Sequence, residues 1–199
     1  MTDLQRAKLT HYFRLIDVDG DGYVTASDWA EVARNLASLR GLKQYTPEYD
    51  AIVAVMGTIW GRLVRRIAHP HRASLEEWLA HEEANAVSCS EEEYESYVNT
   101  ITRGVFRMLA GESRRMTFDE YMDLVVSFWV PPQQAIEAFR RMDTDSSGYL
   151  EETEFVDRVH EFHRSDDPEA PGNWLFGYWG PDALVRARRK APSKSDAVA

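Results

Sequence analysis

The sequence predicts an all-α fold of four helix–loop–helix units, in two lobes that pack as one compact globule. Two acidic loops, at 17–28 and 143–154, each lie between segments whose apolar residues have helical spacing. Two further segments, around 74–78 and 116–121, end in the same way but lack the acidic start. The sequence shows no strand signal longer than a short bridge between loops, so the remaining structure is expected to be helical.

Both acidic loops place oxygen-bearing side chains at their first, third and fifth positions, a glycine at the sixth and an acid at the twelfth. Calcium takes about six to eight oxygen ligands, and alternate side chains of a tightly wound loop converge on one point. This is the ligand pattern of the EF-hand calcium loop, with the seventh residue offering its backbone carbonyl. The sequence therefore predicts two calcium sites, with the ligands Asp17, Asp19, Asp21, Tyr23, Thr25 and Asp28 in the first and Asp143, Asp145, Ser147, Tyr149, Glu151 and Glu154 in the second.

The two loops differ in the residue that closes them. Glu154 is long enough to present both carboxylate oxygens to an ion, whereas Asp28 is one methylene shorter. A shorter closing acid favours a smaller coordination sphere, and magnesium requires compact six-fold geometry. We therefore expect the first site to tolerate magnesium better than the second.

Residues 1–86 are predicted to form an N-terminal pair of units, the first active and the second silent. Apolar residues flank the first loop at helical spacing: Leu9, Tyr12, Phe13 and Ile16 before it, and Trp29, Val32, Ala33 and Leu36 after it. Thr46 and Pro47 then predict a helix start, and one face of that helix carries Ile52, Val55, Met56, Ile59, Leu63 and Ile67. The second loop is basic over 69–72, looks shortened and ends in a Ser74/Glu77 capping box, so we expect no metal there.

Residues 90–163 are predicted to form a C-terminal pair, the third unit silent and the fourth active. A Ser90/Glu93 capping box opens a helix whose buried face carries Tyr94, Tyr97, Val98, Ile101, Val105 and Met108. The third loop has Arg114 at the glycine position and ends in a Thr117/Glu120 capping box, so it is expected to be empty. Prolines at 131–132 precede the last unit, in which Ile136 and Phe139 lead into the acidic loop and Phe155, Val159 and Phe162 lead out.

The C-terminal residues form two further segments. Residues 164–180 are rich in turn residues and then in aromatic ones, and we expect this segment to pack back onto the lobes. Residues 181–199 are predicted to form a flexible basic tail. Three tryptophans, Trp29, Trp78 and Trp129, fall on apolar helix faces and are expected in the core, with a cavity for an apolar ligand as the alternative.

Composition excludes several classes of function. The net charge of −10 repels nucleic acid and suits a cation binder. No signal peptide and no run of about 18 apolar residues is found, so neither secretion nor a membrane span is expected. A single cysteine, Cys89, fits the reducing cytoplasm, and a monomer is expected. The sequence contains no Gly-rich phosphate loop, no nucleophile elbow and no carboxylate pair outside the calcium loops, which indicates that the protein is not an enzyme.

Over about residues 1–180 the chain resembles the sarcoplasmic calcium-binding protein family, and within it the bacterial calerythrin-like members. The resemblance rests on four hands in one chain, some of them silent, and on the segment 165–177 that ends Pro171-Gly172-Asn173-Trp174-Leu175-Phe176-Gly177. It implies two lobes packed against each other and calcium buffering or signalling in the cytoplasm. It also implies a loaded third hand, for which residues 109–114 of this chain lack the carboxylates.

Three functions compete, and a calcium buffer or signal modulator is favoured. Only six methionines occur, and they are dispersed, so the Met-rich groove of promiscuous sensors is not apparent. The alternative is a sensor that exposes an apolar groove to a protein target when calcium binds. The third function is a carrier of an apolar small molecule, because coelenterazine-binding proteins and photoproteins are relatives that hold such ligands among aromatic residues.

Overall fold

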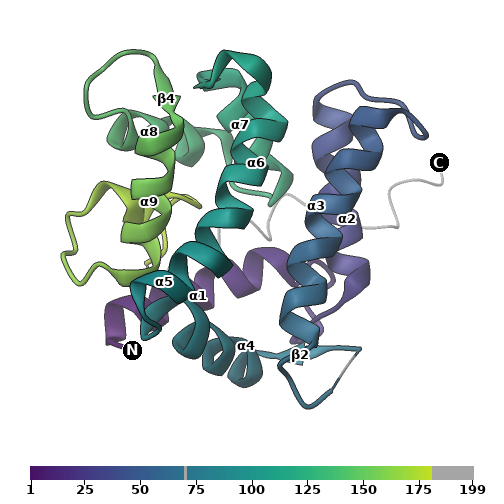
Figure 1. The fold of residues 1–199 in the computed structure, drawn as a ribbon, viewed down its shortest axis with the longest axis vertical. Helices are drawn as coiled ribbons and strands as arrows, with labels where there is room; N and C mark the ends of the chain where they lie inside the picture. Colours follow the sequence, from purple (N-terminus) through teal and green to yellow (C-terminus); the bar gives the residue numbers. More distant parts are fainter. Residues whose placement is uncertain (70, 181–199) are drawn as a thin grey trace, which may run out of the picture.

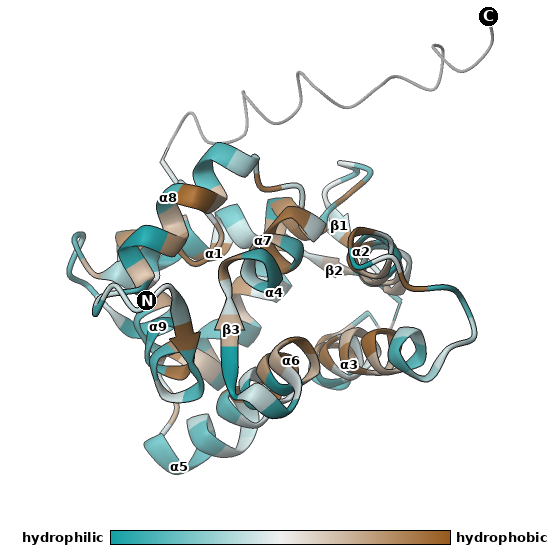
Figure 2. Ribbon diagram, turned by 90° about the horizontal axis from the view of Figure 1, so that it is seen from above, coloured by the Kyte–Doolittle hydropathy of each residue, from teal (hydrophilic) through white to brown (hydrophobic). Residues whose placement is uncertain are grey.

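A computed structural model describes residues 1–69 and 71–180, and its fold is all-α as predicted (Figure 1). The α-helices of this part of the chain are α1 (Asp3–Ile16), α2 (Ala26–Leu39), α3 (Pro47–Val64), α4 (Leu75–Glu82), α5 (Glu91–Tyr94), α6 (Thr100–Ala110), α7 (Phe118–Ser127), α8 (Pro132–Met142) and α9 (Glu152–Arg164). The strands are β1 (Tyr23–Val24), β2 (Ala73–Ser74), β3 (Arg115–Thr117) and β4 (Tyr149–Glu151). Figure 2 shows apolar stretches along α2, α3 and α6, which contribute to the core.

Capping boxes start several helices. The predicted boxes of Ser74, Ser90 and Thr117 are all formed, each with the glutamate three residues later. Two more occur, at Thr2 and Thr25. In each box a side-chain oxygen accepts from a backbone N–H that has no partner within the helix, so these helix ends are fixed locally by sequence.

Short antiparallel strands join the loops in pairs. In the first pair Val24 lies opposite Ala73, so the first acidic loop is bridged to the basic loop that precedes α4. In the second pair Met116 lies opposite Leu150, which bridges the third loop to the second acidic loop. The basic loop is not shortened as expected: residues 65–72 separate α3 from β2, whereas residues 17–22 separate α1 from β1.

A π-helical segment, Glu95–Asn99, lies between α5 and α6. A π turn holds one residue more than an α turn and therefore rotates the helix face that follows it. The predicted residue Val105 is buried, and so are Phe106 and Leu109, which the predicted face did not include. Met108, predicted on that face, is only half-buried.

The chain after α9 packs against the helices. The ring of Phe176 stacks on Tyr12 of α1, with their centroids 4.1 Å apart. The Tyr121 hydroxyl donates to the Leu175 carbonyl at 2.9 Å. Lys8 of α1 is fully buried and donates to the carbonyls of Glu161 and Ser165 at 3.1 Å and to Asn173 Oδ1 at 2.6 Å. The predicted basic tail, residues 181–199, lies outside the described residues.

Trp129 does not lie in the core, and that expectation is wrong. It is 38% exposed and has a φ of 60°, in the left-handed region. Helix α7 ends at Ser127, and the chain must turn before the two prolines that open α8. Trp129 therefore belongs to the turn, whereas Trp29 and Trp78 are buried as predicted.

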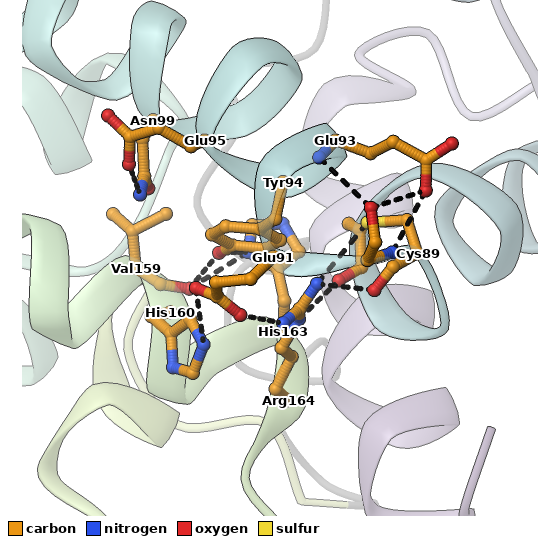
Figure 3. A network of polar contacts seen from close by, with 12 residues as sticks. Cys89, Glu91, Glu93, Tyr94, Glu95, Asn99, Val159, His160, His163 and Arg164 are labelled. Atoms are coloured by element: carbon orange, nitrogen blue, oxygen red, sulfur yellow. Dashed lines mark hydrogen bonds and ion pairs between the residues drawn. The ribbon is translucent and has the colours of Figure 1, made fainter.

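Arg164, at the end of α9, ties that helix to the segment before α5 (Figure 3). Its guanidinium donates to the carbonyls of Ala86 and Cys89, both at 2.9 Å, and pairs with Glu91 at 2.7 Å. It also lies 4.2 Å from the centroid of the Tyr94 ring. Carbonyls at a helix end lack partners within the helix. The Arg164 side chain satisfies two such carbonyls and so fixes α9 to the segment before α5.

Candidate metal centre

The first acidic loop brings three carboxylates together. Asp17 caps the C-terminus of α1, and one carboxylate oxygen of each of Asp17, Asp19 and Asp21 lies within 4.8 Å of the others. Gly20 and Gly22 have φ values of 70° and 89°, which allow the tight winding that directs these side chains inward. The loop thus gathers negative charge at one point.

Asp17 carries the observation that tests whether a cation fits here. Its side chain is buried, and its Oδ1 atom has no hydrogen-bond partner among the described residues. Its Oδ2 atom accepts from the Gly22 N–H at 3.1 Å. Burial raises the pKa of Asp17, and the nearby carboxylates of Asp21 and Asp19 raise it further. An unpaired oxygen among like charges is the arrangement that a bound divalent cation would satisfy, so the donor set fits calcium.

The second acidic loop brings together Asp143, Asp145 and Glu154, again with one oxygen of each within 4.8 Å of the others. Asp143 accepts from the backbone N–H groups of Ser147 and Gly148, both at 2.9 Å. The Ser147 hydroxyl donates to the Tyr149 carbonyl at 2.9 Å, so the oxygens of the fifth and seventh positions are adjacent. Three of the six predicted ligands of this loop therefore form one cluster, and two more, Ser147 and Tyr149, contact each other. The sixth, Glu151, is exposed.

The closing acid of the first loop is held elsewhere. Asp28 Oδ2 accepts from the Thr25 hydroxyl at 2.6 Å and from the Thr25 N–H at 2.8 Å, and its Oδ1 accepts from Val18 N–H at 3.2 Å. Glu77 and Glu120 make the same contacts with Ser74 and Thr117 in the other two loops. The Thr25-to-Asp28 spacing matches the capping boxes identified elsewhere in the sequence, and the sequence analysis missed it.

Glu154 is arranged differently because position nine of its loop is Glu151, which makes no side-chain capping bond. Glu154 Oε1 accepts from the N–H of Thr144 at 3.1 Å, as Asp28 Oδ1 does from Val18, and also from the Thr144 hydroxyl at 3.0 Å. Both closing acids therefore contact the second residue of their loop, and the residue at position nine decides whether the closing acid also makes capping bonds at the helix start.

The third loop keeps the turn of a calcium loop without its ligands. Arg114 has a φ of 54° and a ψ of 24°, the left-handed conformation that Gly22 and Gly148 adopt at the same loop position. A residue with a Cβ atom is strained in that region. Exposed arginines fill this loop, with Arg115 stacked over the Tyr149 ring at 4.5 Å, so a cation is disfavoured there.

The EF-hand family model matches residues 9–33 and 136–159, which span the two acidic loops and their flanking helices. With the all-α fold and the paired loops, these matches make the chain an EF-hand protein, and such proteins bind calcium. It is similar to calerythrin and to the sarcoplasmic calcium-binding proteins, as three comparisons indicate.

Calerythrin of Saccharopolyspora erythraea is 21% identical over 165 residues, covering 81% of this chain and 93% of that protein. The calcium-loaded apo form of the coelenterazine-binding protein from Renilla muelleri has a TM-score of 0.71 at 19% identity, covering 89% of this chain and 99% of that one. The sarcoplasmic calcium-binding protein of amphioxus has a TM-score of 0.66 at 14% identity, covering 89% and 99%. The Renilla and amphioxus proteins are named as a coelenterazine-binding and a calcium-binding protein, and none of the three is named as an enzyme.

No helix in the described part of the chain combines the length and apolar character that crossing a membrane requires.

Proposed function

We propose that this protein binds two calcium ions, one in each acidic loop, and acts as a calcium buffer. The convergence of three carboxylates within 4.8 Å in each loop carries this proposal. Each acidic loop is bridged by strands to a loop that lacks ligands, so each lobe would hold one ion. Asp28 is short and is bonded to Thr25, which supports better tolerance of magnesium at the first site.

Calorimetric titration of single variants tests the two sites. Asp17→Ala and Asp143→Ala should each remove one calcium-binding event, because each deletes the carboxylate that opens its loop. Glu120→Gln is the matched control: it alters the closing acid of the third loop, so the titration should be unchanged. Two full binding events in either aspartate variant would refute the assignment.

The packing of residues 164–180 favours the buffer over the sensor. Phe176 contacts the rings of Tyr12, Phe128 and Phe162, so the segment occupies space between helices that a sensor would open. A buffer should therefore bind no additional hydrophobic dye when calcium is added. A calcium-dependent rise in dye fluorescence would instead support the sensor, which exposes a groove to a protein target.

A carrier function is favoured by one observation, a cavity of about 140 Å³ with aromatic walls. The Renilla protein, whose fold is similar, is named for binding coelenterazine. A carrier should co-purify with a ligand that absorbs beyond the protein band, and a clean spectrum would count against it.

We also place the protein in the cytoplasm as a monomer, since its single cysteine, Cys89, is a free thiol that contacts the Asn85 carbonyl at 3.2 Å. Gel filtration against standards should give the mass of one chain, and a dimer would contradict this.

A further inference from the structure

The cavity lies among α1, α3, α4, α6, α7, α9 and the segment after α9. Its lining residues are buried or half-buried. Six aromatic residues form much of the wall: Tyr12, Trp78, Tyr97, Phe128, Phe155 and Phe176. A cavity of about 150 Å³ with apolar walls in another protein binds benzene. This cavity therefore has room for a single ring.

One side of the cavity is polar, and His163 supplies a hydrogen-bond acceptor there. His163 Nδ1 lies 2.8 Å from the Val159 carbonyl, and a carbonyl only accepts, so Nδ1 carries the proton. Burial lowers the pKa of His163 to about 4, which keeps the ring neutral at pH 7. Its Nε2 atom is then an acceptor, and it faces Glu82.

Glu82 supplies the complementary donor. Its side chain is only 14% exposed, and burial raises its pKa to about 8, so its neutral acid form predominates at pH 7. Glu82 Oε2 and His163 Nε2 are 3.7 Å apart, too far for a direct hydrogen bond. A hydroxyl oxygen about 2.8 Å from both atoms could accept from the acid and donate to the imidazole.

Trp78 is a third polar residue of the wall. It is 2% exposed, and its Nε1 atom has no hydrogen-bond partner among the described residues. Buried polar groups normally have partners, so an unpaired indole N–H on a residue that lines the cavity favours a ligand with a polar atom.

We propose that the cavity binds a neutral single-ring aromatic alcohol of the phenol class. The ring would lie among the aromatic walls and the hydroxyl between Glu82 and His163. A ring with a methyl group in that place would leave both polar groups unpaired, which costs affinity. This inference deepens the carrier alternative and rests on it, independently of the calcium sites.

Calorimetric titration of the full calcium-loaded chain with phenol and with toluene tests the proposal, because the two probes differ only in hydroxyl against methyl. Phenol should bind about tenfold tighter than toluene. In Glu82→Leu that ratio should fall to about one while toluene still binds. Glu82→Gln should keep the preference, since a neutral amide also donates. Val105→Phe, which fills the cavity, should abolish binding of both probes.

Equal affinities for phenol and toluene in the wild-type chain would overturn the inference, as would phenol binding that survives Val105→Phe. Far-ultraviolet dichroism checks that each variant folds. If Val105→Phe does not fold, the two variants Glu82→Leu and Glu82→Gln decide alone. A phenol preference that is unchanged in Glu82→Leu then overturns the proposal. A calcium titration of the same sample separates failure of this inference from failure of the calcium sites.

Discussion

Glu82 should make the protein less stable as the pH rises from 6.5 to 8. Burial raises the pKa of its carboxyl from 4.5 to about 8 in the folded chain. Between those values the folded state holds a proton that the unfolded state has lost. The contribution of Glu82 to the free energy of unfolding is therefore fully present below pH 4.5 and is lost as the pH rises through 8.

The window from 6.5 to 8 isolates this effect from other buried groups. Burial lowers the pKa of both His81 and His163 from 6.5 to about 4. The free energy of unfolding therefore rises with pH between about 4 and 6.5 because of these two groups, and their effect is complete above 6.5. Burial lowers the pKa of Lys8 from 10.5 to about 8, so this group changes the free energy of unfolding above the window. Burial raises the pKa of the nearby Tyr12 and Tyr97 well above the window, so both stay neutral in it.

The expected loss follows from the width of the window. One pH unit corresponds to about 1.4 kcal/mol for a single proton, so the free energy of unfolding should fall by about 2 kcal/mol between pH 6.5 and 8. Urea unfolding at several pH values, with saturating calcium throughout, measures it. Glu82→Gln carries a neutral amide at every pH and should flatten the slope. The same slope in both proteins would refute the reasoning.

Two further variants test the packing of the C-terminal segment and the third loop. Lys8→Met removes the donor to two carbonyls and to Asn173, leaves buried acceptors unpaired and should cost about 3 to 5 kcal/mol of stability in urea unfolding. A loss below about 1 kcal/mol would mean that these contacts contribute little. Arg114→Gly should stabilise the protein by about 0.5 to 1 kcal/mol because it relieves a left-handed conformation. Arg114→Ala removes the same side chain without that relief, so an equal gain in both variants would point to charge instead of backbone strain.

The parts of the fold that the sequence predicted depend on residues close together in the chain. A Ser or Thr three residues before a Glu starts a helix through two local hydrogen bonds, and the boxes at Ser74, Ser90 and Thr117 form as expected. The acidic loops also wind locally, because their glycines take positive φ values and turn alternate carboxylates inward. Local chemistry is sufficient for these features.

The parts that escaped prediction depend on contacts distant in sequence. The π-helical segment before Thr100 rotates the following face, and no local pattern marks it. Lys8 reads as a surface residue in a helix, yet it is buried because α9 and Asn173 surround its ammonium group. Glu82 likewise reads as one of several exposed acids, and only the folded arrangement places it beside His163.

The two proposed calcium sites differ more in the residue at loop position nine than in the acid that closes the loop. At the first site the Thr25 hydroxyl and N–H both compete with an ion for Asp28, and the box also starts α2. Binding through Asp28 must therefore exchange two hydrogen bonds for coordination, each worth about 0.5 to 1.5 kcal/mol. At the second site Glu154 holds its place in the cluster without a capping partner at Glu151. Glu77 and Glu120 make the same capping contacts in loops whose described residues form no acidic cluster, so we infer that a site forms only where its ligand set is strong enough to displace the capping box.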